Sequence, residues 1–521
     1  MLKVLQSSKG SLTGLLAHLT PQRIYRWFFP LRPHGGLATK VQGDVLLGLQ
    51  KRHEAFLIFH IDDVDGFKRV LRSHVLDKIT STADVVKAAE EIERYRVSHA
   101  DGFLEHIRGL NLSFSAMGLA KLGVDVAAAF PDDIAFRVGQ QDDALEALGD
   151  PRDVGGLSTW RDVWKGALFS SSSPPSTELS RPAGRRVDGI FLLTAASKHA
   201  LDKAVGKLLK RLSHTISLVR RKDGTVRPGR QAAHEHFGFL DGVTRPTVVG
   251  FNDQHRAPGE TASPADVFIL PASQDWRGNG SFLVVRELQQ KVPEFETWCE
   301  DMAKSVKPCP VHPNLIAARM VGRWQNGVPL VMSPTLEQGN LASDIRLRED
   351  FDFSGDLLGE ACPYVAHIRK ANPRQGSSAS LATVQHRVLR SGIAYGPEVG
   401  EQEKRKGKTE HDRGLFFVCY QSSIENGFRF IQQSWLNSPR IPVDNAVGSV
   451  EPGCDLIAGQ RLSEKGGLRT AQGLLPGSPT SPGDKVAVPS FVVPRGGEYF
   501  FTPSLDGLKH LANYPTGTLI T

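Results

Sequence analysis

The residues best suited to chemistry lie in one short run, Gly238-Phe239-Leu240-Asp241-Gly242. Its acid stands between apolar residues, so the protonation of Asp241 depends on what surrounds it. The two glycines allow the backbone to approach a bulky group closely. A lone G-x-x-D-G pattern is more often a tight turn with a capping Asp, so the rest of the chain has to decide between turn and site.

Three further blocks accompany this run. Residues 362–374 read Cys-Pro-Tyr-Val-Ala-His-Ile-Arg-Lys-Ala-Asn-Pro-Arg, residues 388–396 read Val-Leu-Arg-Ser-Gly-Ile-Ala-Tyr-Gly, and residues 413–421 read Arg-Gly-Leu-Phe-Phe-Val-Cys-Tyr-Gln. In this order the four blocks resemble the dye-decolorizing (DyP-type) haem peroxidases, and the long chain is similar to their fungal branch. The resemblance runs from about residue 41 to the C-terminus. Four ordered blocks make it specific where one block would not.

The resemblance implies a peroxidase with one haem b per chain, which reduces hydrogen peroxide and oxidises dyes, phenols or other aromatic donors through a ferryl intermediate. Asp241 is expected to be the distal acid-base group, with Arg390 stabilising negative charge beside it. His367 is expected to be the iron ligand, and Asp455 the acceptor for its second ring nitrogen. A free Asp has a pKa of about 3.9 and is a base only when ionised, so we expect activity to peak in acid.

The same resemblance assigns residues around the haem. Arg369 and Arg374 are expected to pair with its propionates through bidentate hydrogen bonds. Leu415 and Phe417 alternate onto one side of a strand and are expected to cover the distal face. Phe239, in the first run, is expected to contact the cofactor. A site covered in this way admits peroxide and excludes bulky reductants.

Large dyes must then be oxidised by electron transfer through the protein. Tyr395 and Trp435 match positions that serve as surface radical sites in some relatives, and plain packing is the other interpretation of both. The alternative function is a haem-binding protein for haem handling, iron release or redox sensing. The presence of both Asp241 and Arg390 favours turnover over simple binding.

The pattern of apolar residues predicts an α+β fold with a ferredoxin-like order of elements in the first half. The resemblance implies two such ferredoxin-like domains, with antiparallel sheets and peripheral helices, in a dimeric α+β barrel-like arrangement. The first half alternates short apolar runs with helical spacing in the order strand, helix, strand, strand, helix, strand. Its expected strands are residues 55–61, 110–114, 187–195 and 215–219, and its expected helices are residues 64–97, 116–122 and a segment ending at Leu212.

The second half is expected to carry strands at residues 280–288, 415–421 and 491–501 and a helix at residues 292–304. Duplicated halves are what the resemblance implies, because the sequence shows no clear internal repeat. The predicted divisions are a basic tail or targeting segment (1–40), an N-terminal domain (41–245) and a C-terminal haem-binding domain (246–521). Residues 400–412 are highly charged and are expected to form a solvated loop, and residues 170–175 an exposed one.

The composition limits the kinds of partner that we expect this protein to bind. The chain has 521 residues, and its 40% apolar content includes no run long enough to cross a bilayer, so no membrane span is expected. The net charge of +7 is spread along the chain without an aromatic-interleaved patch, which argues against nucleic acid. We expect a monomer or a homodimer. Residues 1–40 contain several basic residues and no Asp or Glu, which leaves the compartment open between intracellular, including mitochondrial, and secreted.

Rival motifs are scarce. Gly407-Lys408-Thr409 looks like the end of a phosphate-binding loop, but Gln402 stands where that motif requires Gly. His234 and His236 could bind a metal from one strand face, but no third ligand is evident, so core or hydrogen-bonding roles are favoured. The five cysteines include no C-x-x-C pair and are expected to be core thiols.

Overall fold

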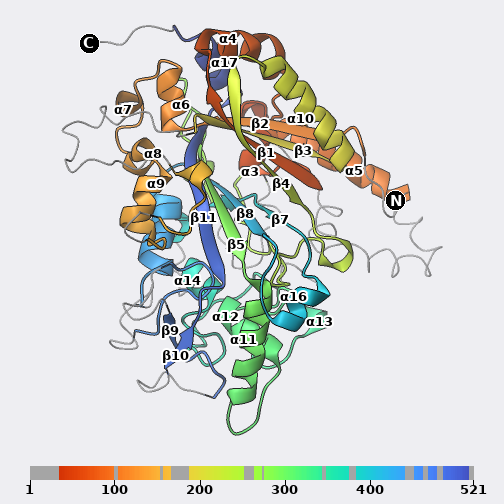
Figure 1. Cartoon of the computed structure of the whole chain (residues 1–521), viewed down its shortest axis with the longest axis vertical. Helices are drawn as coiled ribbons and strands as arrows, with labels where there is room; N and C mark the ends of the chain where they lie inside the picture. The colour runs from red at the N-terminus through yellow and green to blue at the C-terminus, as the bar shows by residue number, and fades with distance from the viewer. Residues whose placement is uncertain are drawn as a thin grey trace.

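The strands that the sequence predicts are present in the computed structural model, which describes residues 35–98, 104–152, 157–165, 187–251, 263–272, 275–342, 348–374, 383–440, 451–460, 468–477 and 485–515. Most of the basic tail and the predicted loop at residues 170–175 lie outside the described residues. Nine strands of the described part form one sheet with the order β4-β1-β3-β2-β11-β5-β8-β6, and β7 pairs with β8. Figure 1 shows this sheet running through the middle of the molecule.

The first four strands form the N-terminal unit, in the order β4-β1-β3-β2 with every pair antiparallel. This order, with a helix after the first and third strands, is the predicted ferredoxin-like arrangement, which is confirmed. Strand β4 continues beyond the predicted end because its basic residues find partners inside the protein, as Arg220 and Lys222 do with Glu287. The elements are β1 (His53–Ile61), β2 (Arg108–Phe114), β3 (Gly189–Ala195), β4 (Ile216–Thr225), α4 (Val64–Val70), α5 (Thr82–Ser98) and α10 (Lys198–Leu212).

The C-terminal unit repeats the same order as β11-β5-β8-β6, so the duplication is visible in the topology although the sequence does not show it. One bridge, between Phe501 and Phe114, joins β11 of this unit to β2 of the first. Its elements are β5 (Ser281–Gln290), β6 (Leu389–Arg390), β7 (Ile393–Tyr395), β8 (Gly414–Gln421), β11 (Val492–Thr502), α11 (Val292–Ser305), α12 (Pro313–Val321) and α14 (His367–Ala371). Strands β9 (Arg469–Gln472) and β10 (Lys485–Val488) form a separate hairpin-like pair.

Shorter helices and the last helix complete the fold. They are α3 (Gly43–Leu46), α6 (Ala116–Lys121), α7 (Val126–Ala129), α8 (Ile134–Val138), α9 (Gln140–Asp143), α13 (Gly339–Ala342), α16 (Glu401–Lys406) and α17 (Leu505–Asn513). Helix α17 lies beside α4 of the N-terminal unit, far from α11 and α12 (Figure 1). Lys68 of α4 donates to the carbonyl of Tyr514 at 2.8 Å, which ties the C-terminal segment to the first unit.

The two ends of the sheet approach one another. A Cβ added at Gly224 in β4 would lie 2.2 Å from Cγ2 of Ile393 in β7, so glycine is what allows this approach. Among the described residues no ladder joins β4 to β7, and the sheet is therefore barrel-like without closing. Phe56 of β1 and Phe416 of β8 meet with ring centroids 4.2 Å apart, so the two units share one apolar core.

The charged segment at residues 400–412 is exposed at most positions, as its composition predicts, but it is not simply a loop. It contains helix α16, and Glu403 within it is buried. Both Glu403 carboxylate oxygens accept hydrogen bonds from the buried guanidinium of Arg413, at 2.9 and 2.5 Å. The prediction was wrong for the helical part and for Glu403, because Arg413 neutralises this acid from ten residues further along the chain, and composition alone does not reveal such a pairing.

Candidate active site

The run from Gly238 to Gly242 forms a tight loop whose shape depends on both glycines. Gly238 has φ +90° and Gly242 has φ +72°, values that favour glycine. A Cβ at Gly238 would also lie 2.7 Å from Nε2 of Gln325. The carboxylate of Glu235 accepts hydrogen bonds from the amides of Phe237 and Phe239, at 2.9 and 2.8 Å. The sequence analysis missed this organising role of Glu235, although the residue stands inside the same run.

Asp241 meets Arg390 at the edge of this loop. Nη1 of Arg390 donates to Oδ1 of Asp241 at 2.9 Å, and the amide of Gly242 donates to the same oxygen at 2.7 Å. The other carboxylate oxygen, Oδ2, has no hydrogen-bond partner among the described residues. The two side chains are 29% and 35% exposed, so solvent-sized molecules can reach the pair. The structure thus brings together two residues that lie 149 positions apart in the sequence.

The strand register puts an apolar surface beside this pair. Arg390 of β6 stands opposite Cys419 of β8, so Arg390, Phe417 and Leu415 lie on the same face of the sheet. Leu415 and Phe417 are half-buried, whereas Phe416, on the other face of β8, is fully buried. The predicted alternation of Leu415 and Phe417 onto one face is present.

A second pair lies at the start of α14. The Nδ1 atom of His367 donates to Oδ2 of Asp455 at 2.8 Å. Asp455 is completely buried, and its Oδ1 accepts from the amides of Ile457, Ala458 and Gly459 at 2.8, 2.5 and 3.3 Å. Burial alone would raise the pKa of Asp455, but His367 and these amide donors hold it below its ordinary value. The imidazole is therefore oriented by an ionised carboxylate.

The second ring nitrogen of His367, Nε2, has no hydrogen-bond partner in the described part of the chain. The side chain is 32% exposed, so this nitrogen is available to a ligand. In a neutral imidazole whose Nδ1 donates to Asp455, the lone pair lies on Nε2. A metal-bound histidine needs this tautomer and a fixed ring orientation.

The loop of Asp241 and the segment of His367 border a common apolar cluster. Phe237 and Phe239 on one side, and Val365 and Leu456 on the other, belong to the same buried set. Phe239 is only 5% exposed and packs inside this cluster. The contact of Phe239 with a cofactor remains a prediction, while its packing role is evident.

The two arginines expected at the propionates are engaged elsewhere. Arg369 is 2% exposed and donates to the carboxylate of Asp356 at 2.8 Å and to the carbonyl of Cys362 at 2.6 Å. Its guanidinium also lies 3.9 Å from the ring centroid of Tyr364. Arg369 therefore has a structural role within the protein, and its contact with a propionate stays a prediction.

Arg374 forms a different link. It donates to the carboxylate of Glu349 at 2.5 Å, and the same carboxylate accepts from Arg323 at 2.6 Å and from the hydroxyl of Thr244 at 3.2 Å. Thr244 follows Asp241 by three residues, so Arg374 is tied to the distal loop through Glu349. A propionate contact of Arg374 stays a prediction.

Neither predicted radical site is at the surface. Tyr395 is 3% exposed, with Nζ of Lys222 lying 3.2 Å from its ring centroid, and Trp435 is 8% exposed. Trp435 packs edge-on against His386 and Phe430, with centroid distances of 5.4 and 5.2 Å. The surface position was therefore wrong for both residues, and an electron-transfer role for either is a separate prediction.

The paired histidines of the first run have other partners. His236 contacts the carbonyl of Tyr395 through Nε2 at 2.9 Å, and burial lowers the pKa of His236 to about 4. Among the described residues, no group of three or more His, Cys, Asp or Glu side chains is arranged to hold a metal ion. The five cysteines are free thiols, and all but Cys309 are buried. No helix in the described part of the chain is long and apolar enough to span a membrane.

An antiparallel α+β sheet, an imidazole oriented by a buried carboxylate and a separate, accessible Asp–Arg pair are the features that the resemblance to haem peroxidases led us to expect. Comparison with known proteins identifies the family.

A family model described as the DyP dimeric alpha+beta barrel domain matches residues 40–228, and a model described as Dyp-type peroxidase, C-terminal, matches residues 319–445. A dye-decolorizing peroxidase of Mycena epipterygia is 35% identical over 503 residues, which cover 91% of this chain and 86% of that protein. The chain belongs to the dye-decolorizing peroxidase family, whose members are haem enzymes.

Solved structures agree. A variant of the dye-decolorizing peroxidase from Pleurotus ostreatus superposes with a TM-score of 0.79 at 36% identity, covering 91% of this chain and 99% of that one. A dye-decolorizing peroxidase in complex with 2,6-dimethoxyphenol gives a TM-score of 0.75 at 33% identity, again with 91% and 99% coverage. The predicted family and fold are thereby confirmed.

Proposed function

We propose that this protein binds one haem b through His367 and uses hydrogen peroxide to oxidise dyes, phenols or other aromatic donors. The observation that carries the proposal is the accessible Asp241–Arg390 pair, with its 2.9 Å contact, in a chain that also holds the oriented imidazole of His367. The 2,6-dimethoxyphenol bound to a relative supports phenols as one class of donor.

The residues fit a haem. The Nε2 atom of His367 would bind the haem iron, and the half-buried Leu415 and Phe417 would offer an apolar surface to a flat, largely apolar group. Haem, when bound, supplies the iron centre that exchanges electrons with peroxide and with the donor. Asp455 accepts the hydrogen bond of Nδ1 of His367 and orients the ring, which would leave Nε2 to bind the iron.

The distal pair handles protons and charge. Oδ1 of Asp241 is occupied by the donors of Arg390 and Gly242, so Oδ2 is the atom that can accept a proton from peroxide. The same atom returns that proton to the departing oxygen, which leaves as water. Arg390 stabilises the negative charge that develops when the first proton leaves. The balance of a full cycle is one peroxide, two one-electron donors and two protons converted to two waters and two oxidised donors, and a phenol supplies its own proton with each electron.

Leu415 and Phe417 limit what reaches this pair. Their side chains share the face of Arg390, so a large dye is kept away from Asp241 while a peroxide molecule is admitted. Electrons from large donors therefore cross the protein. Tyr395 and Trp435 are the two candidate relays. Trp435 precedes Leu436, whose carbonyl accepts a hydrogen bond from the amide of Asp455 at 2.8 Å. Trp435 is therefore the candidate closer to His367.

Visible absorption of the haem-supplemented protein tests the proposal. The wild-type protein should take up one equivalent of haem and show a Soret band that shifts after one equivalent of peroxide. His367→Ala should lose the band, and Asp241→Asn and Arg390→Leu should keep it but react with peroxide more slowly by about 100-fold or more.

Asp275→Asn is the matched control, because Asp275 also pairs with an arginine, at 2.6 Å and with similar exposure, outside the proposed site. It should react as the wild type does. A Soret band that ignores peroxide would shift the assignment to haem handling or sensing. A protein that takes up no stoichiometric haem would contradict the proposal altogether.

A further inference from the structure

Residues 44–51, which comprise most of helix α3 and the turn that leads toward strand β1, contact the backbone that carries Arg390. The hydroxyl of Ser391 donates to Oδ1 of Asp44 at 2.7 Å. Nζ of Lys51 donates to the carbonyl of Ser391, also at 2.7 Å. Strand β6 is only two residues long, so these bonds supply much of what fixes the position of Arg390.

Asp44 also reaches the other side of Arg390. Its Oδ2 accepts from the hydroxyl of Tyr420 at 2.9 Å, and Tyr420 of β8 stands opposite Leu389 in the β6 ladder. Asp44 and Tyr420 are fully buried and Ser391 is nearly so, which makes these hydrogen bonds expensive to break. The carboxylate of Asp44 therefore holds Ser391 directly, and it holds Leu389 through the strand partner Tyr420.

The same segment contacts the loop that carries Asp241. Nη2 of Arg245, four residues beyond Asp241, donates to the carbonyl of Leu46 at 3.2 Å. A Cβ at Gly48 would lie 3.3 Å from Oγ of Ser391 and 3.5 Å from Nη1 of Arg245, so both halves of the distal site converge at this glycine. Gly48 has φ +77°, which other residues rarely adopt.

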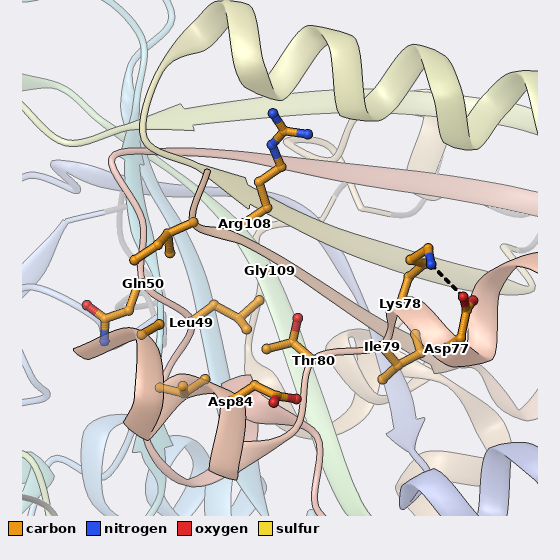
Figure 2. Close-up of a pocket in the computed structure, with 12 residues that line it drawn as sticks. Leu49, Gln50, Asp77, Lys78, Ile79, Thr80, Asp84, Arg108 and Gly109 are labelled. Carbon is orange, nitrogen blue, oxygen red and sulfur yellow. Dashed lines mark hydrogen bonds and ion pairs between the residues drawn. The ribbon is translucent and has the colours of Figure 1, made fainter. Parts of the chain in front are cut away.

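The far end of the segment is also anchored. Leu49 and Gln50 line a cavity of about 320 Å³ together with Thr80 and Arg108 (Figure 2). The amide of Leu49 donates to Oδ1 of Asp44 at 2.9 Å, so the segment folds back on its own carboxylate. Neither Asp241 nor Arg390 lines this cavity.

We infer that residues 44–51 position the distal pair, with Asp44 as the central positioning residue. They act through Ser391 on Arg390 and through Leu46 on the loop of Asp241, and they touch neither peroxide nor haem. The inference rests on the proposed function of Asp241 and Arg390. A displacement of about 1 Å in such a pair is enough to slow a reaction by roughly 100-fold, so loss of the anchor should be visible in the rate.

Ser391→Ala is the sharpest variant, because it removes one hydroxyl and leaves the buried carboxylate in place. We expect the reaction with peroxide to slow by roughly 10- to 100-fold, while the KM for an aromatic donor is unchanged. Tyr420→Phe should act in the same direction. Asp44→Asn removes a buried charge and can fail to fold, so it is the supporting variant only.

Ser113→Ala is the matched control. Ser113 is buried and its hydroxyl contacts Thr502 at 2.7 Å in the ladder between the two units, away from the distal pair. Thermal unfolding of the apoproteins should show similar losses of stability in Ser113→Ala and Ser391→Ala. The peroxide reaction should slow only in the second.

A double variant shows whether Ser391 acts through Arg390. Arg390→Leu with Ser391→Ala should react no more slowly than Arg390→Leu alone, because the group being positioned is gone. An additive loss would overturn the inference, as would equal peroxide rates in Ser391→Ala and the wild type. A wild-type holoenzyme that does not react with peroxide would instead contradict the proposed function, so the two failures are distinguishable.

Discussion

Replacing Asp455 by Asn should uncouple His367 from its role as an iron ligand. The carboxylate accepts on both oxygens, from Nδ1 of His367 on one and from three backbone amides on the other. An Asn has only one acceptor oxygen, and its amide nitrogen must face one of these two sets of donors. Facing the backbone leaves several buried N–H groups unpaired, so we expect the nitrogen to face His367.

His367 then has to accept a hydrogen bond at Nδ1, and its proton moves to Nε2. An Nε2 that carries a proton cannot bind iron, so the affinity for haem should fall by about 10- to 100-fold or more. Stability should fall as well, because Arg469 and Lys370 lie buried near this carboxylate and lose its charge. Removing one member of such a buried group costs about 3–5 kcal/mol.

Soret titration of the apoprotein with haem measures the affinity, and urea unfolding of the apoprotein measures the stability. Asp188→Asn is the control: Asp188 is equally buried and accepts from Lys121 and from the amide of Ile61, at 2.5 and 2.7 Å, in the N-terminal unit. It should lose stability and keep its haem affinity. An Asp455→Asn variant that bound haem as tightly as the wild type would refute the tautomer argument.

Three other changes have defined outcomes. Burial, opposed by Lys51, raises the pKa of Glu54 from 4.5 to about 7. The contribution of Glu54 to the stability of the fold is therefore complete below pH 4.5 and is lost as the pH rises to 7. Urea unfolding at both pH values should show the free energy of unfolding of Glu54→Gln rising by about 3 kcal/mol relative to that of the wild type across this range. Gly238→Ala should cost about 1–3 kcal/mol in the same assay, because φ is +90° and the new Cβ meets Gln325, and an unchanged midpoint would contradict the assigned backbone. Arg369→Met should lower the free energy of unfolding by about 3–5 kcal/mol, because the partly buried Asp356 loses its partner. A Soret titration should show unchanged haem affinity, and a weaker affinity would support a contact of Arg369 with a propionate.

The sequence predicts the strands well because their apolar runs are continuous and their ends are marked by turns. It also predicts the main chemical groups, since Asp241, His367 and Arg390 stand in ordered blocks that resemble one family. The contact between His367 and Asp455 spans 88 residues and follows from the general need of a metal-bound imidazole for an acceptor, not from any local pattern.

The misjudged environments share one physical cause, which is a partner that no local sequence pattern reveals. Arg369 looked available for a propionate until Asp356 and the ring of Tyr364 enclosed it. Glu403 looked solvated until Arg413 was found to bury it. Asp44 attracted no attention at all, because its partners Ser391 and Tyr420 follow it by 347 and 376 residues. Local composition reports the charge of a side chain and says nothing of what will neutralise it.

The two carboxylates of the proposed site differ in the way that their tasks require. An acid that orients an imidazole has to stay ionised. Asp455 is fully buried, and both of its carboxylate oxygens accept hydrogen bonds from N–H groups of the protein. An acid that moves a proton needs one oxygen without a permanent donor, and Asp241 keeps Oδ2 in that state while Oδ1 is held by Arg390 and Gly242. Full burial of Asp241 would fix its position but would also prevent peroxide from reaching it. Asp241 must therefore be held in place through its neighbours Arg390 and Arg245. Residues 44–51 contact Ser391, which follows Arg390, and the side chain of Arg245.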